Sequence, residues 1–253
     1  MNNKNIFSSK EFDNWLDRDG LQPEEKKLIV DYLEKDKSTL EAGTASGRIL
    51  FEMNKLGFTN LSGFDFIPEY ISAAKKRNNN SIINFSVQDA TKLDFGNELF
   101  GQIIYLQQII STIEEPGMRL SALEESYRVL EKGGTAIFSF LSFESKKNDS
   151  VFKIISPVIK FFRFIKSKKI SEQYIPWLKF SGKVNFKALF DIGPYNYWFR
   201  RQEIIELLES VGYKIEFYGY PKKILFNNSS TKSAFGKSTE EVGHFYVVCK
   251  KVL

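Results

Sequence analysis

The sequence predicts an α/β fold with a doubly wound, seven-stranded mixed sheet, and three observations support this prediction. Apolar runs of strand length alternate with amphipathic stretches of helical length from Ser38 to Phe140. A turn of small residues joins the first strand to a helix, and acidic residues end the second and third strands. We expect the strand order 3-2-1-4-5-7-6, an antiparallel last strand, helices on both faces and a helical cap insert.

The composition is typical of one globular domain and argues against several kinds of site. The chain has 253 residues, 42% of them hydrophobic, with a net charge of +5 and a sequence pI of about 9.0. One cysteine and one histidine exclude an intramolecular disulfide and argue against a metal centre, so we expect no metal. The N-terminus lacks a signal-peptide core, and no apolar run reaches the roughly 18 residues of a membrane span. We therefore expect a cytoplasmic protein.

The chain begins with a helical region, residues 1–36. Two helices are expected between Lys10 and Lys35, the second with Pro23 near its start, where the missing N–H costs nothing. Most of this region should pack on the sheet. Trp15 is the residue in it that we consider a candidate for contact with a ligand.

The first strand and its turn form the most informative stretch, S-T-L-E-A-G-T-A-S-G-R-I-L from Ser38 to Leu50. Glu41 lies at the strand end, and Gly43 and Gly47 flank the turn, which lets the backbone approach a ligand closely. The acidic-x-Gly-x-Ala-x-Gly pattern resembles motif I of class I S-adenosylmethionine-dependent methyltransferases. Ala45 replaces the usual middle glycine, and alanine resists the positive φ expected there.

The next two strands carry acids at positions that also resemble this family. L-S-G-F-D ends at Asp65, whose carboxylate can accept both hydrogens of a ribose diol or can cap the helix that begins at Pro68. The strand from Ile82 to Ala90 ends in Asp89-Ala90; in the family, this acid meets the adenine amino group, although Asp89 is also a common turn residue. The resemblance implies a cofactor site made of Glu41, Gly43, Thr44, Gly47, Asp65, Phe66, Asp89, Ala90 and Gln107.

Strands and helices continue to alternate along the chain until an insert at residues 143–195. The fourth strand, Gly101 to Leu106, ends at Gln107 and Gln108, and the fifth is T-A-I-F-S-F. The last two strands are K-I-E-F-Y-G-Y and H-F-Y-V-V-C-K-K, separated by a polar, mobile loop from Pro221 to Gly243. His244 opens the last strand, which favours a structural role over a catalytic one. Cys249 lies inside that strand, as expected for a buried thiol.

The insert contains V-F-K-I-I-S-P-V-I-K-F-F-R-F-I-K, with a polar stripe that includes Arg163 and a wide apolar face. Pro157 should kink or interrupt this helix. Three interpretations remain open: a lid over the acceptor, an interface helix for a partner or a membrane at residues 151–169, or simple packing on the body. We favour the lid. Tyr195 and Tyr197 follow the insert, and the candidate acceptor residues are Trp15, Gln108, Tyr195 and Tyr197.

The resemblance implies one methyltransferase domain over residues 1–253 that uses S-adenosyl-L-methionine and releases S-adenosyl-L-homocysteine. We expect a small-molecule acceptor, partly apolar or aromatic, and in-line methyl transfer in which the protein supplies proximity and alignment. A general base, if the acceptor needs one, would be Tyr, Asp or Glu. The alternatives are methylation of RNA or protein, or an inactive nucleoside-binding module. The sequence does not identify the acceptor atom or the oligomeric state.

Overall fold

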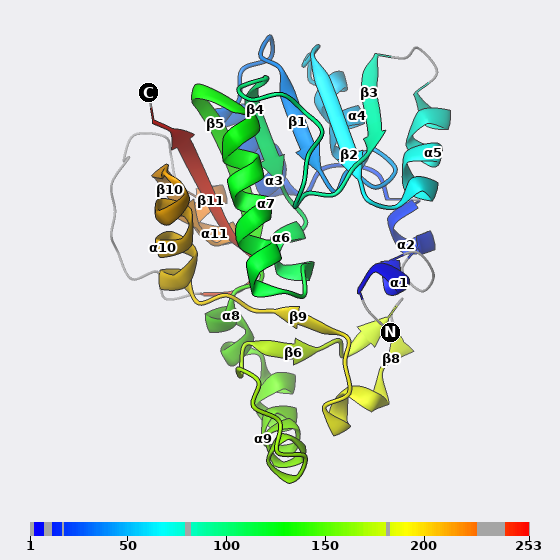
Figure 1. Ribbon diagram of the computed structural model, residues 1–253, viewed down its shortest axis with the longest axis vertical. Coiled ribbons are helices and arrows are strands. Elements are labelled where there is room, and N and C mark those ends of the chain that lie inside the picture. The colour runs from blue at the N-terminus through cyan, green and yellow to red at the C-terminus, as the bar shows by residue number, and fades with distance from the viewer. Residues whose placement is uncertain are drawn as a thin grey trace.

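A seven-stranded mixed sheet forms the upper body of the molecule in Figure 1. The structure is a computed structural model that describes residues 3–7, 12–16, 18–78, 82–180, 183–226 and 241–252. The strand order is β3-β2-β1-β4-β5-β11-β10, and β11 runs antiparallel to both of its neighbours. The predicted order is therefore confirmed, with β10 and β11 as the sixth and seventh strands. The strands are β1 (Thr39–Ala42), β2 (Leu61–Asp65), β3 (Ile83–Val87), β4 (Phe100–Tyr105), β5 (Leu130–Phe140), β10 (Tyr213–Gly219) and β11 (Phe245–Lys251).

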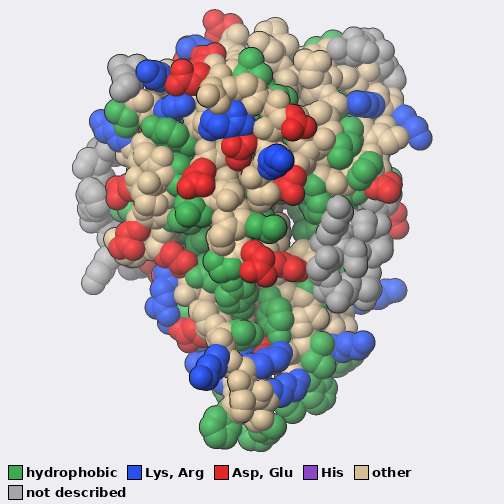
Figure 2. All heavy atoms as spheres, in the orientation of Figure 1, with side chains coloured by type: hydrophobic (Ala, Val, Ile, Leu, Met, Phe, Trp, Pro, Cys, Tyr) green, Lys and Arg blue, Asp and Glu red, His purple; other side chains and the backbone are tan. Residues whose placement is uncertain are grey.

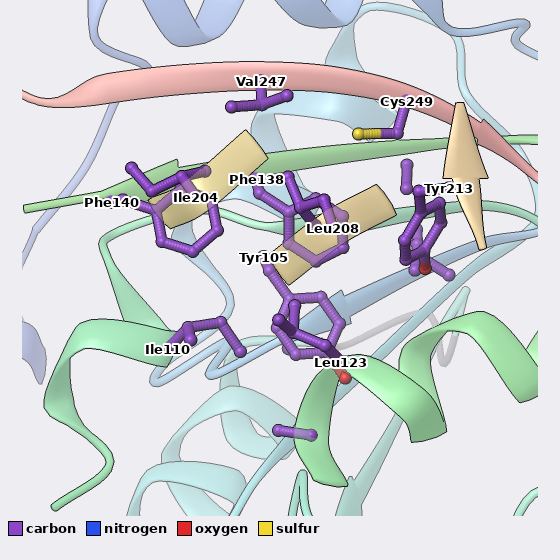
Figure 3. Packing of buried hydrophobic residues seen from close by; sticks show 14 of the residues in the cluster. Tyr105, Ile110, Leu123, Phe138, Phe140, Ile204, Leu208, Tyr213, Val247 and Cys249 are labelled. Carbon is purple, nitrogen blue, oxygen red and sulfur yellow. The ribbon is translucent and has the colours of Figure 1, made fainter. Parts of the chain in front are cut away.

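Alternating side chains along the central strands build a core on each face of the sheet. On β4, Ile103 and Tyr105 enter one core, whereas Ile104 enters the other. The first core is rich in aromatic rings, such as those of Tyr105 and Phe138, whose centroids lie 5.5 Å apart (Figure 3). Both faces are apolar because helices cover both, as expected for parallel strands buried on two sides.

The helices divide between the two faces. One core includes side chains of α6 (Ile109–Thr112), α7 (Pro116–Val129) and α10 (Arg201–Val211). The other includes side chains of α3 (Pro23–Tyr32), α4 (Arg48–Lys55), α5 (Pro68–Arg77) and α11 (Pro221–Phe226). Two short helices, α1 (Asn3–Phe7) and α2 (Phe12–Leu16), precede them. Lys10 and Glu11, where we predicted the first of two helices to begin, lie outside the described residues.

The insert forms a cap at the carboxyl ends of the parallel strands, drawn below the sheet in Figure 1. It contains α8 (Phe143–Asn148), α9 (Ser150–Ile165), β6 (Tyr174–Pro176), β7 (Lys179–Phe180), β8 (Lys183–Val184), η1 (Phe186–Phe190) and β9 (Tyr195–Tyr197). The pairs β6-β9 and β7-β8 form small antiparallel sheets that the sequence did not predict. Two- and three-residue strands leave too short an alternation to be recognised in a sequence.

Two local expectations differ from the structure. We predicted that Pro157 kinks or interrupts this helix, and α9 continues through it without interruption. Pro157 is exposed, where water can satisfy the carbonyl that loses its partner. The predicted loop after β10 begins instead as the helix α11, and its residues 227–240 lie outside the described residues. Within the described chain, none of the helices has the length and apolarity needed to span a membrane.

Candidate cofactor and acceptor site

The loop after β1 turns through three residues in the left-handed region. Gly43, Ala45 and Gly47 have φ values of 64°, 46° and 87°. A Cβ on Gly43 would overlap the Ile109 side chain, and one on Gly47 would lie 2.7 Å from the Phe51 ring. Both positions therefore need glycine for space as well as for backbone geometry. The loop leads directly into α4, whose free N–H groups point toward the carboxyl edge of the sheet.

Ala45 adopts the positive φ that alanine resists, and its surroundings hold it there. Its backbone N–H donates to Asp65 Oδ2 at 3.0 Å. Thr44 N–H donates to the Phe64 carbonyl at 3.0 Å, so the loop is joined to the end of β2 at two points. The substitution of the usual glycine by alanine therefore leaves the turn intact, at the cost of some backbone strain.

Asp65 does not cap α5, whose N-cap residue is Ile67, and its contact with the ribose stays a prediction. Its Oδ1 accepts the Ile67 N–H at 3.0 Å, just before α5 begins, while Oδ2 faces the loop. The side chain is 5% exposed, and burial raises its pKa to about 6. Each carboxylate oxygen retains a lone pair beyond these bonds, so the group can still accept hydrogen bonds from a diol.

Glu41 supplies a second buried carboxylate beneath the same loop. Its Oε2 accepts the Thr44 hydroxyl at 2.6 Å. Burial raises its pKa to about 7, and the Thr44 hydrogen bond and the Arg48 charge act in the opposite direction. Glu41 and Thr44 thus form a hydrogen-bonded pair that connects the end of β1 to the loop that follows it.

Asp89 and Ala90 follow the third strand, β3, whose end lies next to Asp65 at the end of β2. Gln88 N–H donates to the Asp65 carbonyl at 3.1 Å, which fixes the end of β3 next to the end of β2. Asp89 is exposed, and its Oδ1 accepts both the Thr91 N–H and the Thr91 hydroxyl. It forms the turn that we considered as an alternative, and its contact with adenine stays a prediction. Phe66 is 37% exposed beside this edge.

A buried ion pair that the sequence analysis missed lies beside the loop. Arg48, the first residue of α4, donates to both oxygens of Glu25 at 2.9 and 3.0 Å. The Gln107 amide also donates to Glu25, which is fully buried. Gln107 therefore faces this carboxylate in the structure. Two opposite charges at helix starts could have suggested this ion pair: Arg48 directly follows Gly47 at the start of α4, and Glu25 lies in the first turn of α3.

The N-terminal helices cover the loop. The Ser46 hydroxyl donates to the carbonyls of Trp15 at 3.3 Å and Leu16 at 2.8 Å. This places the half-buried Trp15 at the loop, far in sequence from it. Its proposed contact with the acceptor stays a prediction.

Gln108 and His244 meet at the ends of β4 and β11. Gln108 Nε2 lies 2.8 Å from His244 Nδ1, and Gln108 N–H donates to the Ser139 hydroxyl at 2.9 Å. Burial lowers the pKa of His244, which favours the neutral imidazole. The sequence analysis, which favoured a structural role for His244, did not predict its contact with Gln108.

The two candidate tyrosines of β9 have different surroundings. Tyr197 is 9% exposed, lies under the Arg119 guanidinium and donates its hydroxyl to Glu203 at 2.6 Å, so its side chain belongs to the core. Tyr195 instead lines a hollow of about 650 Å³ between the cap and the end of α6. The other lining residues are Glu114, Glu115, Ile170, Tyr174, Ile192, Gly193 and Pro194.

The helix α6 connects this hollow with the cofactor loop. Its first residue, Ile109, packs over Gly43, and Glu114 beyond its end lines the hollow. Asn3 of α1 connects the end of α6 with β9 of the cap. Its backbone N–H donates to Glu114 at 2.7 Å, and its side-chain amide donates to the Tyr195 carbonyl at 3.1 Å. Among the residues that the structure describes, there is no cluster of His, Cys, Asp and Glu side chains that could hold a metal ion.

Comparison with known proteins agrees with this geometry. Residues 39–134 match the family model described as a methyltransferase domain. An S-adenosylmethionine-dependent methyltransferase of Methanosarcina mazei has a TM-score of 0.66 at 19% identity, with 93% of this chain and 100% of that chain covered. No curated protein matches the chain.

Two further structures share the fold. The 1,6-didemethyltoxoflavin-N1-methyltransferase of Burkholderia thailandensis has a TM-score of 0.60 at 14% identity, covering 99% of this chain and 87% of that chain. An S-adenosylmethionine-dependent methyltransferase of Thermotoga maritima has a TM-score of 0.57 at 16% identity, covering 98% of each chain.

Residues 39–134 therefore carry a methyltransferase domain, and the chain has the fold of S-adenosylmethionine-dependent methyltransferases. The Burkholderia thailandensis enzyme, which shares this fold, was solved with bound S-adenosylhomocysteine. The buried carboxylates, the left-handed loop and the free helix N–H groups are a donor and acceptor set that suits a nucleoside with a polar tail.

Proposed function

We propose that the protein transfers the methyl group of S-adenosylmethionine to a small, partly apolar acceptor bound in the hollow beneath the cap. The observation that carries this proposal is the link through α6: Ile109 lies against the loop at Gly43, and the hollow begins at Glu114. A volume of about 650 Å³ falls in the range of small-molecule sites. Isoleucine, proline and tyrosine side chains dominate its lining.

In this proposal, each strand end has one task in holding the cofactor. Asp65 accepts hydrogen bonds from the ribose hydroxyls, Asp89 and the Ala90 N–H meet the adenine, and the loop from Gly43 to Gly47 lies along the amino-acid tail. The cofactor supplies a sulfonium with a good leaving group. The chain therefore needs to align the acceptor and exclude water, and the cap is the element placed to do so.

The charges around the hollow argue against a nucleic-acid acceptor. Glu114 and Glu115 line the hollow and are exposed, and they would repel a phosphate backbone. Several basic residues lie instead at the far end of the cap, along α9. The Burkholderia thailandensis structure, which contains bound 1,6-didemethyltoxoflavin, shows that the shared fold accommodates a small heteroaromatic acceptor.

The test is methyl transfer from labelled S-adenosylmethionine to three kinds of acceptor: a small-molecule panel, total RNA and a protein extract. We expect label in small molecules, and we expect Tyr195→Ala to raise KM for the acceptor while leaving S-adenosylhomocysteine affinity unchanged. Val30→Ala, an exposed change on α3, is the control. Label in RNA or protein would contradict the small-molecule proposal, and cofactor binding without transfer to any acceptor would support the inactive binding module.

A further inference from the structure

The helix α9 exposes its apolar face to solvent. Val151, Ile154, Val158, Phe161 and Ile165 recur at intervals of three and four, so they share one face of the helix. All five are exposed, with Ile154 75% exposed, and the nearby Phe164 is 83% exposed. Figure 2 shows hydrophobic side chains gathered at the tip of the molecule where α9 lies in Figure 1. A lid that buries this face over the acceptor is therefore not the arrangement in the structure.

A buried ion pair fixes the helix in this orientation. Arg163 was predicted to lie on a polar outer stripe, but it is 9% exposed and pairs with the fully buried Asp191 at 3.0 Å. Its guanidinium also donates to the carbonyls of Ser171 and Tyr174. Phe152 and Ile159 flank it on the inner face. With these contacts made, rotation of the apolar face inward would remove Arg163 from the buried Asp191 carboxylate and leave it only the Lys168 ammonium, at 3.3 Å.

The segment that carries the exposed apolar face is rich in basic residues. From Lys146 to Lys169 the only acidic residue is Asp149. Lys153 and Lys160, seven residues apart, lie on one flank of the face and are exposed. The basic residues in this segment are Lys146, Lys147, Lys153, Lys160, Arg163, Lys166, Lys168 and Lys169.

A groove of about 290 Å³ opens on the same flank of α9. Phe152, Ile159 and Ile175 give it an apolar lining. Lys153, Lys160 and Glu172 also line it, and Lys160 Nζ lies 3.7 Å from Glu172 Oε2. An apolar groove bordered by ammonium groups suits an amphiphile with an anionic head and a hydrocarbon tail.

We propose that α9 docks this protein on the surface of an anionic lipid membrane. The helix has the features of an interfacial helix: phenylalanine and aliphatic side chains on one face, lysines beside them, and a length of 16 residues that suits lying in the surface. The apolar face enters the headgroup region, while the lysines contact anionic headgroups. The sheet, at the opposite end of the molecule from α9, stays away from the lipid (Figure 1).

The charge pattern favours lipid over a protein partner. A contiguous apolar face of this kind on a protein surface marks a contact site. The lysine-rich surround with one acid in the segment matches a continuous anionic surface, whereas a second copy of this chain would bring the same positive charges against each other. The docking does not depend on the identity of the methyl acceptor.

The experiment is flotation of the full-length protein with vesicles of phosphatidylcholine alone or of equimolar phosphatidylcholine and phosphatidylglycerol. We expect partitioning at least about tenfold stronger on the anionic vesicles, reduced by high salt. The double variant Ile154→Ser with Phe161→Ser should lose this binding by about tenfold or more, as should Lys153→Gln with Lys160→Gln. Val30→Ser with Met118→Ser, two exposed apolar positions elsewhere, should bind like the parent.

All substituted side chains are exposed, and circular dichroism should show that each variant folds as the parent does. Absence of binding to either vesicle, or equal binding by the parent and the α9 variants, would overturn the proposal. A dimer in light scattering that the serine variant converts to a monomer, without vesicle binding, would overturn it in favour of a second copy.

Discussion

Asp65 Oδ2 accepts the backbone N–H of Ala45 at 3.0 Å, so the end of the second strand holds the turn that follows the first. The two residues are 20 positions apart in the sequence. This hydrogen bond places a buried carboxylate next to a left-handed residue at the carboxyl edge of the sheet.

Removal of the Asp65 carboxylate should weaken cofactor binding. We expect Asp65→Ala to reduce the affinity for S-adenosylhomocysteine by about 1.5–3 kcal/mol, because charge-assisted hydrogen bonds to the ribose are lost. Asp65→Asn, which keeps the shape and one acceptor, should lose less. Isothermal titration calorimetry measures both, with the exposed Asp36→Ala as control. Unchanged affinity in both Asp65 variants would show that the ribose lies elsewhere.

The loop should respond in opposite ways to two changes. Gly43→Val places a branched side chain at a φ of 64° and against Ile109, so it should abolish cofactor binding and lower stability. Ala45→Gly relieves alanine at a φ of 46°, so binding should persist and the free energy of unfolding should rise by about 0.5–1 kcal/mol. Thermal unfolding and calorimetry measure these effects. Loss of binding in Ala45→Gly, with normal folding, would mean that the turn is misassigned.

The buried Glu41 should make stability depend on pH. Its pKa is raised from 4.5 to about 7 in the folded protein, chiefly by burial. The folded state therefore holds a proton that the unfolded state has already released, and the free energy of unfolding should fall as the pH rises from about 4.5 to about 7.

Glu41→Gln, which keeps an oxygen for the Thr44 hydroxyl, should flatten this dependence by up to about 3 kcal/mol. Urea titrations at several pH values measure it. Identical pH profiles for the parent and Glu41→Gln would show that Glu41 is not the group responsible.

The Arg48–Glu25 pair should be sensitive to removal of one partner. Arg48→Met leaves the Glu25 carboxylate buried beside Gln107 with its main charge partner removed, which should cost about 3–5 kcal/mol of stability. The control is Lys27→Met, which breaks the solvent-accessible Lys27–Asp31 pair and should cost less than about 1 kcal/mol. Equal effects of the two changes on urea unfolding would argue against this assignment.

The sequence by itself determined the central fold and the edge of the sheet at which we propose the cofactor site. Apolar strands alternating with amphipathic helices are local patterns that predict a parallel sheet with crossovers, and the family resemblance implies the order of the strands. The acidic-x-Gly-x-Ala-x-Gly turn predicted a ligand loop, and the structure shows Gly43, Ala45 and Gly47 all at positive φ. These features could be read from the sequence because each depends on residues close together in the chain.

Only the tertiary structure decided which side of α9 is buried and which residues meet at the site. Arg163 turned inward because Asp191, 28 residues later, offered a buried carboxylate, and a helical pattern alone cannot show a partner at that distance. The same holds for Glu25 with Arg48 and for Gln108 with His244, which are joined across 23 and 136 residues. A periodicity identifies an apolar face of a helix. Whether that face is buried, and which charged side chains pair, depends on contacts that form only when distant segments pack together.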